Sequence, residues 1–229
     1  MLARDIEKDG GARSLSEAES MAILEEFGIP LVGQRKVRDL DDALKAASDL
    51  GYPVVLKACA EGLAHKTDKG LVRLHLNDES DLSAAFDDLV GKHHGEFIIQ
   101  EQLEGAREIM VGGIRDPQFG PCVSFGIGGV MTELLDDVVF RVAPVSRVEA
   151  GEMLEDIRGN RILDTFRGES AIDRDILVGT IIGLSDLMVQ RGDIREVDIN
   201  PMIVRRDGRP VAVDALIIVA TQAEQAKHV

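Results

Sequence analysis

One stretch of the sequence, YPVVLKACAEGLAHKTDKGLVRL at residues 52–74, constrains the fold more than any other. An apolar, β-type run ends in Lys57, and a loop that contains His65, Lys66 and a further lysine follows it. A second β-type run then brings the chain back, so the stretch predicts a hairpin with a flexible, cationic tip. The amides and ammonium groups of such a tip suit the phosphates of a nucleotide, whereas the plainer alternative is a solvated hairpin with incidental charges. Lys57 alone leaves a similar choice open, between a side chain that snorkels from a strand end and one that meets an anion.

The charge and composition of the chain argue against several classes of partner. The chain has 229 residues, 45% of them hydrophobic and 29% charged, which is the mix of an ordinary globular protein. A formal net charge of −15 and an aromatic content of 3% argue against binding to nucleic acid or to an anionic membrane. We find no pattern of a signal peptide or of a membrane span, and Cys59 and Cys122 lie in apolar runs, as reduced cysteines do. We therefore expect a cytoplasmic protein.

Helical and strand-like patterns alternate in the first half of the chain, and strands cluster later. The first helix is expected to begin at Ser14, because Ser14 and Glu17 have the spacing of a capping box, and to end at Gly28. Further helices are predicted at 39–50, 79–90, 147–157 and 173–190, and strands at 29–32, 54–58, 71–76, 97–101, 107–112, 121–125, 138–142, 194–200 and 210–214. This order favours an α+β fold over an all-parallel, doubly wound sheet.

Two carboxylates stand out in the middle of the chain. Glu101 follows the strand-like run FIIQ and leads into a short connector, where it could accept from a ribose hydroxyl or be an ordinary exposed glutamate. Glu108 alternates into the apolar run REIMVGG, and a carboxylate in such a run needs a lysine or a metal as its partner.

A row of oxygen ligands marks the C-terminal part of the chain. In the predicted strand at 194–200, alternation places Glu196, Asp198 and Asn200 on one face. Antiparallel pairing with the next strand could bring Asp214 beside this row. Rigidly held oxygen ligands of this kind suit magnesium, and the plainer alternative is the polar face of an edge hairpin.

The sequence GIGG at 126–129 is weak as a dinucleotide fingerprint, because it lacks both the spacing and the downstream acidic residue. It fits a loop that approaches a phosphate closely. Arg141 could contact phosphate or form an ordinary salt bridge.

Five motifs, in order along the chain, resemble a known family. They are VVLKACAEGLAHKTDKGLVRL, FIIQEQLEGAREIMVGGIRDPQFGP, FGIGGVMTELLDDVVFRVAP, FRG and EVDINPMIVRRDGRPVAVDA. Together they are similar to the ATP-grasp (β) subunit of ADP-forming (NDP-forming) acyl-CoA synthetases, and more distantly to the nucleotide-binding β subunit of succinyl-CoA synthetase. The resemblance spans residues 14–219.

The resemblance implies an ATP-grasp fold, in which two α+β lobes clamp a nucleotide. We expect a flexible N-terminal tail at 1–13, an N-terminal lobe at 14–96, a C-terminal lobe at 97–220 and a C-terminal tail at 221–229.

The resemblance also implies a role for each candidate residue. His65 matches the histidine that, in this family, carries a phosphoryl group between the nucleotide and the partner subunit, and neutral imidazole is a suitable nucleophile for that task. The implied nucleotide contacts are Lys57, Glu101, Leu103 and Glu108, the implied magnesium ligands are Asn200 and Asp214 with Asp198 nearby, and further phosphate contacts are expected from Lys66 and Arg141.

The implied reaction is carboxylate + CoA + ATP ⇌ acyl-CoA + ADP + phosphate, with ATP or ADP and Mg²⁺ bound by this chain. The family's CoA-binding Rossmann domain and its ligase domain are not among the 229 residues. We therefore expect the chain to be either an excised domain or one subunit of a hetero-oligomer with an α-type, CoA-binding partner subunit, with a small carboxylic acid and CoA as substrates. The alternatives are a stand-alone ATP-grasp carboxylate–amine ligase, which needs no phosphohistidine, and the ATP-grasp-like regulatory module of a protein acetyltransferase, which binds nucleotide without turnover.

Overall fold

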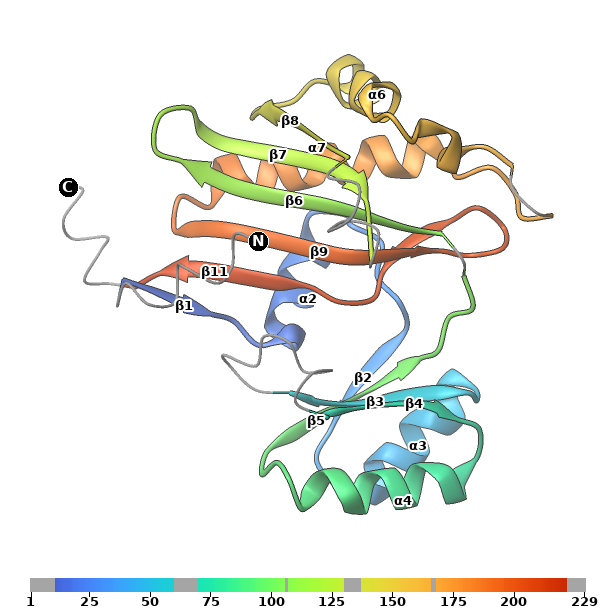
Figure 1. Ribbon diagram of the computed structural model, residues 1–229. Helices are drawn as coiled ribbons and strands as arrows, with labels where there is room; N and C mark the ends of the chain where they lie inside the picture. The colour runs from blue at the N-terminus through green and yellow to red at the C-terminus, as the bar shows by residue number, and fades with distance from the viewer. Residues whose placement is uncertain (1–10, 60–69, 106, 130–136, 166–167, 222–229) are drawn as a thin grey trace. The chain divides into compact units, whose positions relative to one another are not determined.

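The computed structural model describes residues 11–59, 70–105, 107–129, 137–165 and 168–221. The chain divides into two compact units, which we describe separately. The smaller unit contains residues 16–18 and 32–103, and the larger unit contains residues 1–15, 19–31 and 104–229. The α+β class expected from the sequence is confirmed, because each unit combines a sheet with helices (Figure 1).

The described part of the smaller unit is a four-stranded antiparallel sheet with two helices (Figure 1). The strands are β2 (Gln34–Val37), β3 (Val54–Cys59), β4 (Val72–Leu76) and β5 (Glu96–Glu101), in the order β2-β5-β3-β4, and the helices are α3 (Leu40–Leu50) and α4 (Glu79–Val90). Each helix is capped by the aspartate just before its first residue, Asp39 for α3 and Asp78 for α4, whose side chain accepts from a backbone amide three residues later. Apolar side chains such as Ala47, Leu82 and Phe97 form the core between sheet and helices.

The described part of the larger unit is a seven-stranded sheet with three α-helices and a short 3₁₀ helix (Figure 1). Its strands are β1 (Ala12–Ser14), β6 (Glu108–Asp116), β7 (Gly120–Ile127), β8 (Val138–Val142), β9 (Ile194–Val204), β10 (Pro210–Ala212) and β11 (Leu216–Ala220). The main order is β1-β11-β9-β6-β7-β8, and β10 pairs with β9. The helices are α2 (Glu17–Glu26), α6 (Arg147–Asp156), α7 (Arg174–Gln190) and the 3₁₀ helix η2 (Asn160–Leu163).

The three α-helices of the larger unit cover one face of its sheet. Met21 of α2, Met153 of α6 and Leu184 of α7 share a core with strand residues such as Val111 and Val197. Because strand side chains alternate, Asp198 and its same-face neighbours project from the opposite face. The sheet therefore separates an apolar core from a face that carries the predicted ligands.

The start of the first helix differs from the sequence prediction. Ser14 lies in β1, paired with Ile218, and α2 begins at Glu17. The expected capping box of Ser14 and Glu17 is therefore wrong, because Ser14 belongs to a strand and does not precede the first turn of the helix directly. A capping box does form at α6, where the Ser146 hydroxyl accepts from the Glu149 amide and the Glu149 carboxylate accepts from the Ser146 amide.

The two units also differ from the lobes expected from the sequence. β5 pairs with β2 and β3, so residues 97–101 belong to the smaller sheet instead of the C-terminal lobe. The expected N-terminal tail contributes Ala12 and Arg13 to β1. Most of α2 packs in the larger unit. We therefore propose that the lobes follow the two units.

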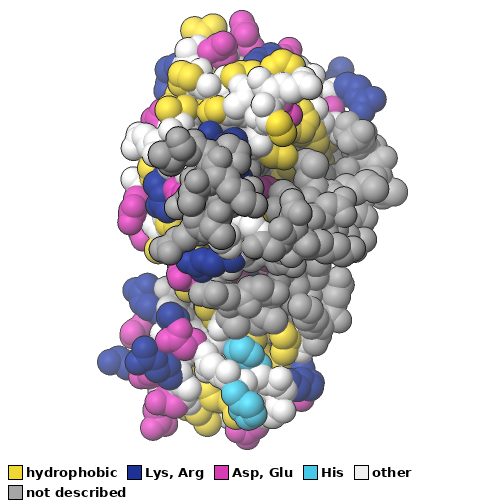
Figure 2. Space-filling view, turned by 90° about the vertical axis from the view of Figure 1, so that its left-hand side faces the viewer, with side chains coloured by type: hydrophobic (Ala, Val, Ile, Leu, Met, Phe, Trp, Pro, Cys, Tyr) yellow, Lys and Arg dark blue, Asp and Glu magenta, His cyan; other side chains and the backbone are white. Residues whose placement is uncertain are grey.

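The surface of the described residues mixes charges of both signs. Acidic and basic side chains are interspersed on the face that Figure 2 shows. Within the described residues, no helix is both long and apolar enough to cross a membrane.

Candidate functional site

Lys57 lies in the centre of the smaller sheet. It occupies β3, opposite Ile98 of β5 on one side and Val72 of β4 on the other. Its ammonium Nζ donates to Oε1 of Glu17 at 2.9 Å, and both side chains are buried. A lysine held in this way is a fixed positive charge, because the surrounding sheet leaves its stem little freedom.

The predicted catalytic loop falls outside the described residues, and with it His65 and Lys66. The two strands that lead into and out of it are described. The amide of Ala58 donates to the carbonyl oxygen of Leu71 at 3.0 Å, which closes the base of the hairpin predicted from the sequence. The hairpin expectation is therefore confirmed for the stem.

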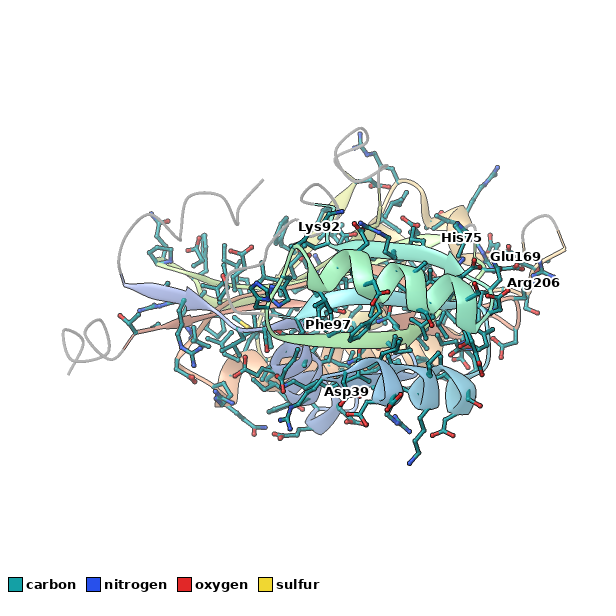
Figure 3. All side chains as sticks on the ribbon, turned by 90° about the horizontal axis from the view of Figure 1, so that it is seen from below. Asp39, His75, Lys92, Phe97, Glu169 and Arg206 are labelled. Carbon is teal, nitrogen blue, oxygen red and sulfur yellow. The ribbon has the colours of Figure 1, made fainter. Side chains whose placement is uncertain are left out.

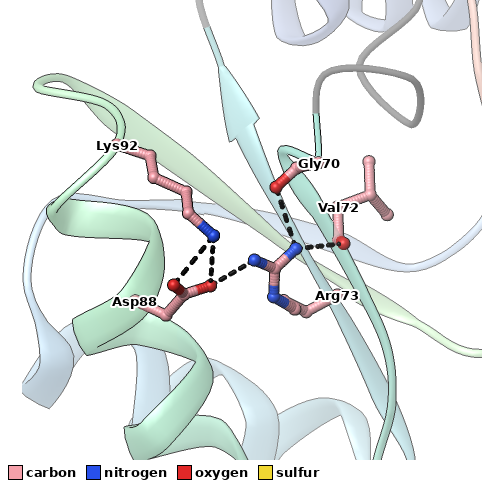
Figure 4. Close-up of polar contacts among 5 residues, drawn as sticks. All are labelled: Gly70, Val72, Arg73, Asp88 and Lys92. Carbon is pink, nitrogen blue, oxygen red and sulfur yellow. Dashed lines mark hydrogen bonds and ion pairs between the residues drawn. The ribbon is translucent and has the colours of Figure 1, made fainter.

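An arginine anchors the returning side of this hairpin (Figure 4). Arg73 donates from Nη1 to the carbonyl oxygens of Gly70 at 2.9 Å and Val72 at 2.8 Å. Its Nη2 also pairs with Asp88 of α4, and Lys92 donates to the same carboxylate. These two cations lower the pKa of Asp88, with Lys92 the larger influence. Arg73 thereby connects Gly70, which lies shortly before β4, to α4.

Glu101 and Leu103 stand at the end of β5, where the chain leaves the smaller unit. The amide of Glu101 donates to the carbonyl oxygen of Gly33 at 2.9 Å, and the amide of Gln102 donates to that of Pro53 at 3.2 Å. A Cβ at Gly33 would lie 3.5 Å from Oε2 of Glu101, so the carboxylate lies close over this glycine. The connector therefore has a defined backbone, with a half-buried Glu101 and Leu103 beside it.

The larger unit brings Glu108 and the GIGG loop together. The amide of Gly128 donates to the carbonyl oxygen of Glu108 at 2.9 Å, and a Cβ at Gly129 would lie 1.6 Å from Oε2 of Glu108. Gly129 also has φ +65°, a conformation that favours glycine. The GIGG loop therefore packs closely against the Glu108 carboxylate, and its approach to a phosphate stays a prediction.

Asn200 of β9 also contacts the GIGG loop, and with Glu108 and Gly129 it forms a cluster. Its Oδ1 accepts from the amide of Gly129 at 3.0 Å. The pairing of β6 with β9 shifts register here, because Val111 lies opposite Ile199 while Ile109 lies opposite Met202. Two residues of β9, Asn200 and Pro201, therefore stand against one of β6, which is a β-bulge of the kind often found beside active sites.

Asp198 and Asp214 approach from neighbouring segments. Asp198 lies opposite Leu216 of β11 and Gly112 of β6. Asp214 follows β10, and the amide of Val213 before it donates to the carbonyl oxygen of Pro201 at 3.3 Å. The backbone thus places Asp214 next to the bulge that carries Asn200, as the predicted antiparallel pairing requires.

The donor set of this cluster fits magnesium. In the described ranges, no three His, Cys, Asp or Glu side chains form a group that could hold a metal ion. The proposed ligands include an amide oxygen, and Mg²⁺ completes its shell with water and phosphate oxygens. Each proposed side-chain ligand binds through an oxygen atom. Because Gly129 has no Cβ, space remains beside the Glu108 carboxylate that a Cβ would fill. The residues present therefore fit Mg²⁺ with a nucleotide phosphate.

Glu196 shares the face of Asp198 but differs in environment. It is buried, and its Oε2 has no hydrogen-bond partner in the described structure. Burial raises the pKa of Glu196, and the negative charge of Asp198 raises this pKa further. Glu196 is therefore a poorly solvated carboxyl group two residues from a proposed ligand.

Arg141 forms an ion pair with Asp156 of α6. This contact is the ordinary salt bridge that the sequence left open as the alternative to a phosphate contact. A phosphate contact at Arg141 stays a prediction.

Sequence reasoning missed Arg107, whose side chain is 2% exposed. Its guanidinium donates to Oε2 of Glu169 at 2.9 Å and to the carbonyl oxygens of Ile162, Asp164 and Ser170. It thereby ties Ile162, Asp164, Glu169 and Ser170 to the residue just before β6. A lone arginine before an apolar strand gives no local signal of such partners, which lie more than 50 residues away.

Comparisons with known proteins identify the family to which the chain belongs. The family model of the ATP-grasp domain matches residues 7–219. The β subunit of acetate–CoA ligase [ADP-forming] I from Pyrococcus furiosus is 36% identical over 214 residues, which are 90% of this chain and 92% of that subunit. Acetate–CoA ligase [ADP-forming] I from Archaeoglobus fulgidus is 38% identical over 202 residues, which are 85% of this chain but only 29% of that protein. The chain thus spans nearly all of one relative and less than a third of the other.

A solved structure of an acetyl-coenzyme A synthetase from Ca. Korarchaeum cryptofilum is also similar. The TM-score is 0.79 at 35% identity, and the match covers 90% of this chain and 92% of that chain. That structure contains coenzyme A and Mg-AMPPCP, with a phosphohistidine segment pointing towards the nucleotide binding site.

Proposed function

The chain belongs to the ATP-grasp family, and from this premise we propose that it is the nucleotide-binding subunit of an ADP-forming acyl-CoA synthetase. The reaction is carboxylate + CoA + ATP ⇌ acyl-CoA + ADP + phosphate. The observation that carries the proposal is the cluster of Glu108, Gly129 and Asn200, because it combines oxygen ligands with a glycine loop at one point of the larger sheet. The named relatives favour this reaction over a carboxylate–amine ligase or a regulatory module.

The chain's own residues have distinct tasks in this proposal. Lys57 neutralises phosphate charge, and Glu101 and Leu103 contact the ribose and adenine. Asn200 and Asp214, with Asp198 nearby, hold Mg²⁺, which when bound polarises phosphate oxygens. Positioning and charge stabilisation of this kind account for most of the catalysis in phosphoryl transfer.

His65 is the proposed relay for the phosphoryl group. Its neutral imidazole attacks the γ-phosphorus of ATP, so that a P–N bond forms as the bond to ADP breaks. The phosphoryl group then passes to the partner subunit. Lys66 offsets the charge of the phosphoryl group on its way.

A partner subunit is part of the proposal. The Pyrococcus relative, of which this chain covers 92%, is named as a β subunit. We propose that the partner is an α-type subunit that binds most of the CoA, and that the two form a hetero-oligomer acting on a small carboxylic acid. A cytoplasmic location stays a prediction.

Calorimetry tests the nucleotide site directly. Titration of ATP into the purified chain should give heat with Mg²⁺, and the Lys57→Ala and Asp214→Asn variants should lose most of it. Lys45→Ala is the matched control, because Lys45 is an exposed lysine on α3 of the same unit. A heat signal that Lys57→Ala leaves unchanged would argue strongly against the site.

Turnover assays test the relay. The chain alone should not form acyl-CoA, and addition of the CoA-binding partner should restore the reaction. His65→Ala should abolish phosphoryl exchange with the partner while ATP binding persists. If His65→Asn supports near-normal turnover, His65 is a phosphate ligand and the relay is wrong.

A further inference from the structure

His75 of β4 has an unusual backbone. Its φ is +59°, and it is the one non-glycine residue in the described ranges with a positive φ. The pairing of β3 with β4 shifts register at this point, because Val54 lies opposite Leu76 while Leu56 lies opposite Arg73. β4 therefore has a bulge at His75, which lies at the opposite end of α4 from Lys92 (Figure 3). A non-glycine residue keeps a backbone with positive φ only where its surroundings stabilise that conformation.

What holds His75 is Gln102, in the connector that follows Glu101. The amide of His75 donates to Oε1 of Gln102 at 2.5 Å, and Nε2 of Gln102 lies 2.6 Å from Nδ1 of His75. The carboxamide oxygen already accepts from the backbone, so its nitrogen faces the ring as a donor. Nδ1 is then placed as the acceptor of this bond, which corresponds to the tautomer that carries its proton on Nε2.

The backbone on either side of Gln102 is held as well. Gly33 accepts from the amide of Glu101, and Pro53 accepts from the amide of Gln102 itself. These bonds fix where the connector passes, but a backbone bond leaves the side chain of Gln102 free to turn. The two contacts with His75 hold the side chain of Gln102, the residue that stands between Glu101 and Leu103.

We propose that His75 is a positioning residue for the nucleotide. It acts through Gln102 to hold the connector residues Glu101 and Leu103 where they contact the ribose and adenine. The inference rests on the proposed function for the role of these two residues, and it goes beyond that function because that function assigns no task to His75 or Gln102.

Variants of His75 and Gln102 test the proposal. His75→Gly keeps the backbone conformation, since glycine adopts positive φ readily, but loses the ring acceptor. It should fold normally and bind Mg·ATP about tenfold more weakly, as expected for the loss of one ordered hydrogen bond. His75→Asn should recover most of the affinity, because asparagine tolerates this backbone and offers an amide oxygen to Gln102.

A variant of Gln102 and a control variant of another histidine complete the test. Gln102→Met removes both contacts with His75, the one to its backbone amide and the one to its ring, and should weaken Mg·ATP binding at least as much as His75→Gly. His94→Gly is the matched control, because His94 is an exposed histidine of the same unit, and it should bind as the unaltered chain does. Wild-type affinity in both His75→Gly and Gln102→Met overturns the proposal.

The tautomer of His75 gives a test that needs no nucleotide. ¹⁵N NMR of the imidazole should show Nδ1 unprotonated and Nε2 protonated in the unaltered chain. A protonated Nδ1 overturns the proposal whatever the binding data show. Absence of Mg·ATP binding in the unaltered chain would instead refute the proposed function, with the tautomer still reporting on the contact with Gln102.

Discussion

Lys57 and Glu17 form a buried ion pair, with Nζ of the lysine 2.9 Å from Oε1 of the glutamate. The lysine that the sequence marks for nucleotide phosphates thus has a carboxylate partner without any nucleotide. The side chain of Glu17 is 1% exposed and that of Lys57 is 9% exposed. Charges this deeply buried depend on each other, since neither can recover its solvation if the other is removed.

Removal of Glu17 should therefore destabilise the fold. We expect Glu17→Ala to lower the free energy of unfolding by about 3–5 kcal/mol, because it leaves a buried ammonium without its carboxylate. Urea denaturation measures this change. Glu155→Ala, which breaks an exposed pair with Arg174, is the control and should cost about 1 kcal/mol or less. Equal losses in the two variants would show that burial of the Lys57 pair has no consequence.

Gly129→Ala should remove Mg·ATP binding. The new methyl group would lie 1.6 Å from Oε2 of Glu108, so that carboxylate must move away from the loop. Gly28→Ala is the matched control, because Gly28 has φ +74° but no atom lies within 4 Å of the place that its new methyl group would take. Both variants should lose about 1–2 kcal/mol of stability from the left-handed backbone, and only Gly129→Ala should lose the calorimetric heat with Mg·ATP. Intact binding in Gly129→Ala would show that the GIGG loop is not part of the Mg·ATP site.

Glu196 should make stability depend on pH. Its pKa is raised from an ordinary value of 4.5, so the folded chain holds this proton more tightly than the unfolded chain. The stability that Glu196 contributes is then fully present below pH 4.5 and is lost as pH rises through the folded pKa. Glu196→Gln should remove this loss, so its advantage over the unaltered chain in urea denaturation should grow from about pH 4 to about pH 7. A constant difference across that range would mean that Glu196 titrates normally.

Arg107 should matter for stability more than any exposed arginine. Its guanidinium reaches four acceptors in the 162–170 segment, and Arg107→Met leaves all of them without this donor. We expect a loss of about 3–5 kcal/mol in the free energy of unfolding. Arg206→Met, which breaks an exposed pair with Glu104, should cost about 1 kcal/mol or less. Similar midpoints in thermal denaturation for the two variants would contradict this role.

Much of the fold could be predicted from local patterns. The helix at 79–90 forms as expected, because Leu82, Phe86 and Leu89 fall on the face that it buries. The strand at 138–142 also forms as expected, although Phe140 and Val142 are exposed. The strand at 194–200 extends to Val204, past a bulge that no local pattern announces. β11 was missed although its run LIIVA is typical of a buried strand, so the signal was present in the sequence.

The candidate site was less accessible to sequence reasoning. Same-face alternation placed Asp198 on the ligand face, and the resemblance to a family supplied the roles. Neither could reveal that Glu17, 40 residues before Lys57, would be its partner, or that Gln102 would hold His75, which gave no sequence signal of its own. Such contacts depend on tertiary packing, and the same residue types form capping boxes and surface turns elsewhere.

The pairing of β1 with β11 bears on how this unit is combined with others. Ala12 lies opposite Ala220, so the first and last described strands lie side by side at one edge of the sheet. A module whose ends meet can be spliced into a longer polypeptide, or expressed separately, without rearranging its interior. The relatives show both genetic arrangements, one in which the matched region fills a subunit and one in which it is a minor part of a longer chain. Because the first and last described strands of the larger unit are neighbours, a fusion at this edge can leave the rest of the sheet unchanged.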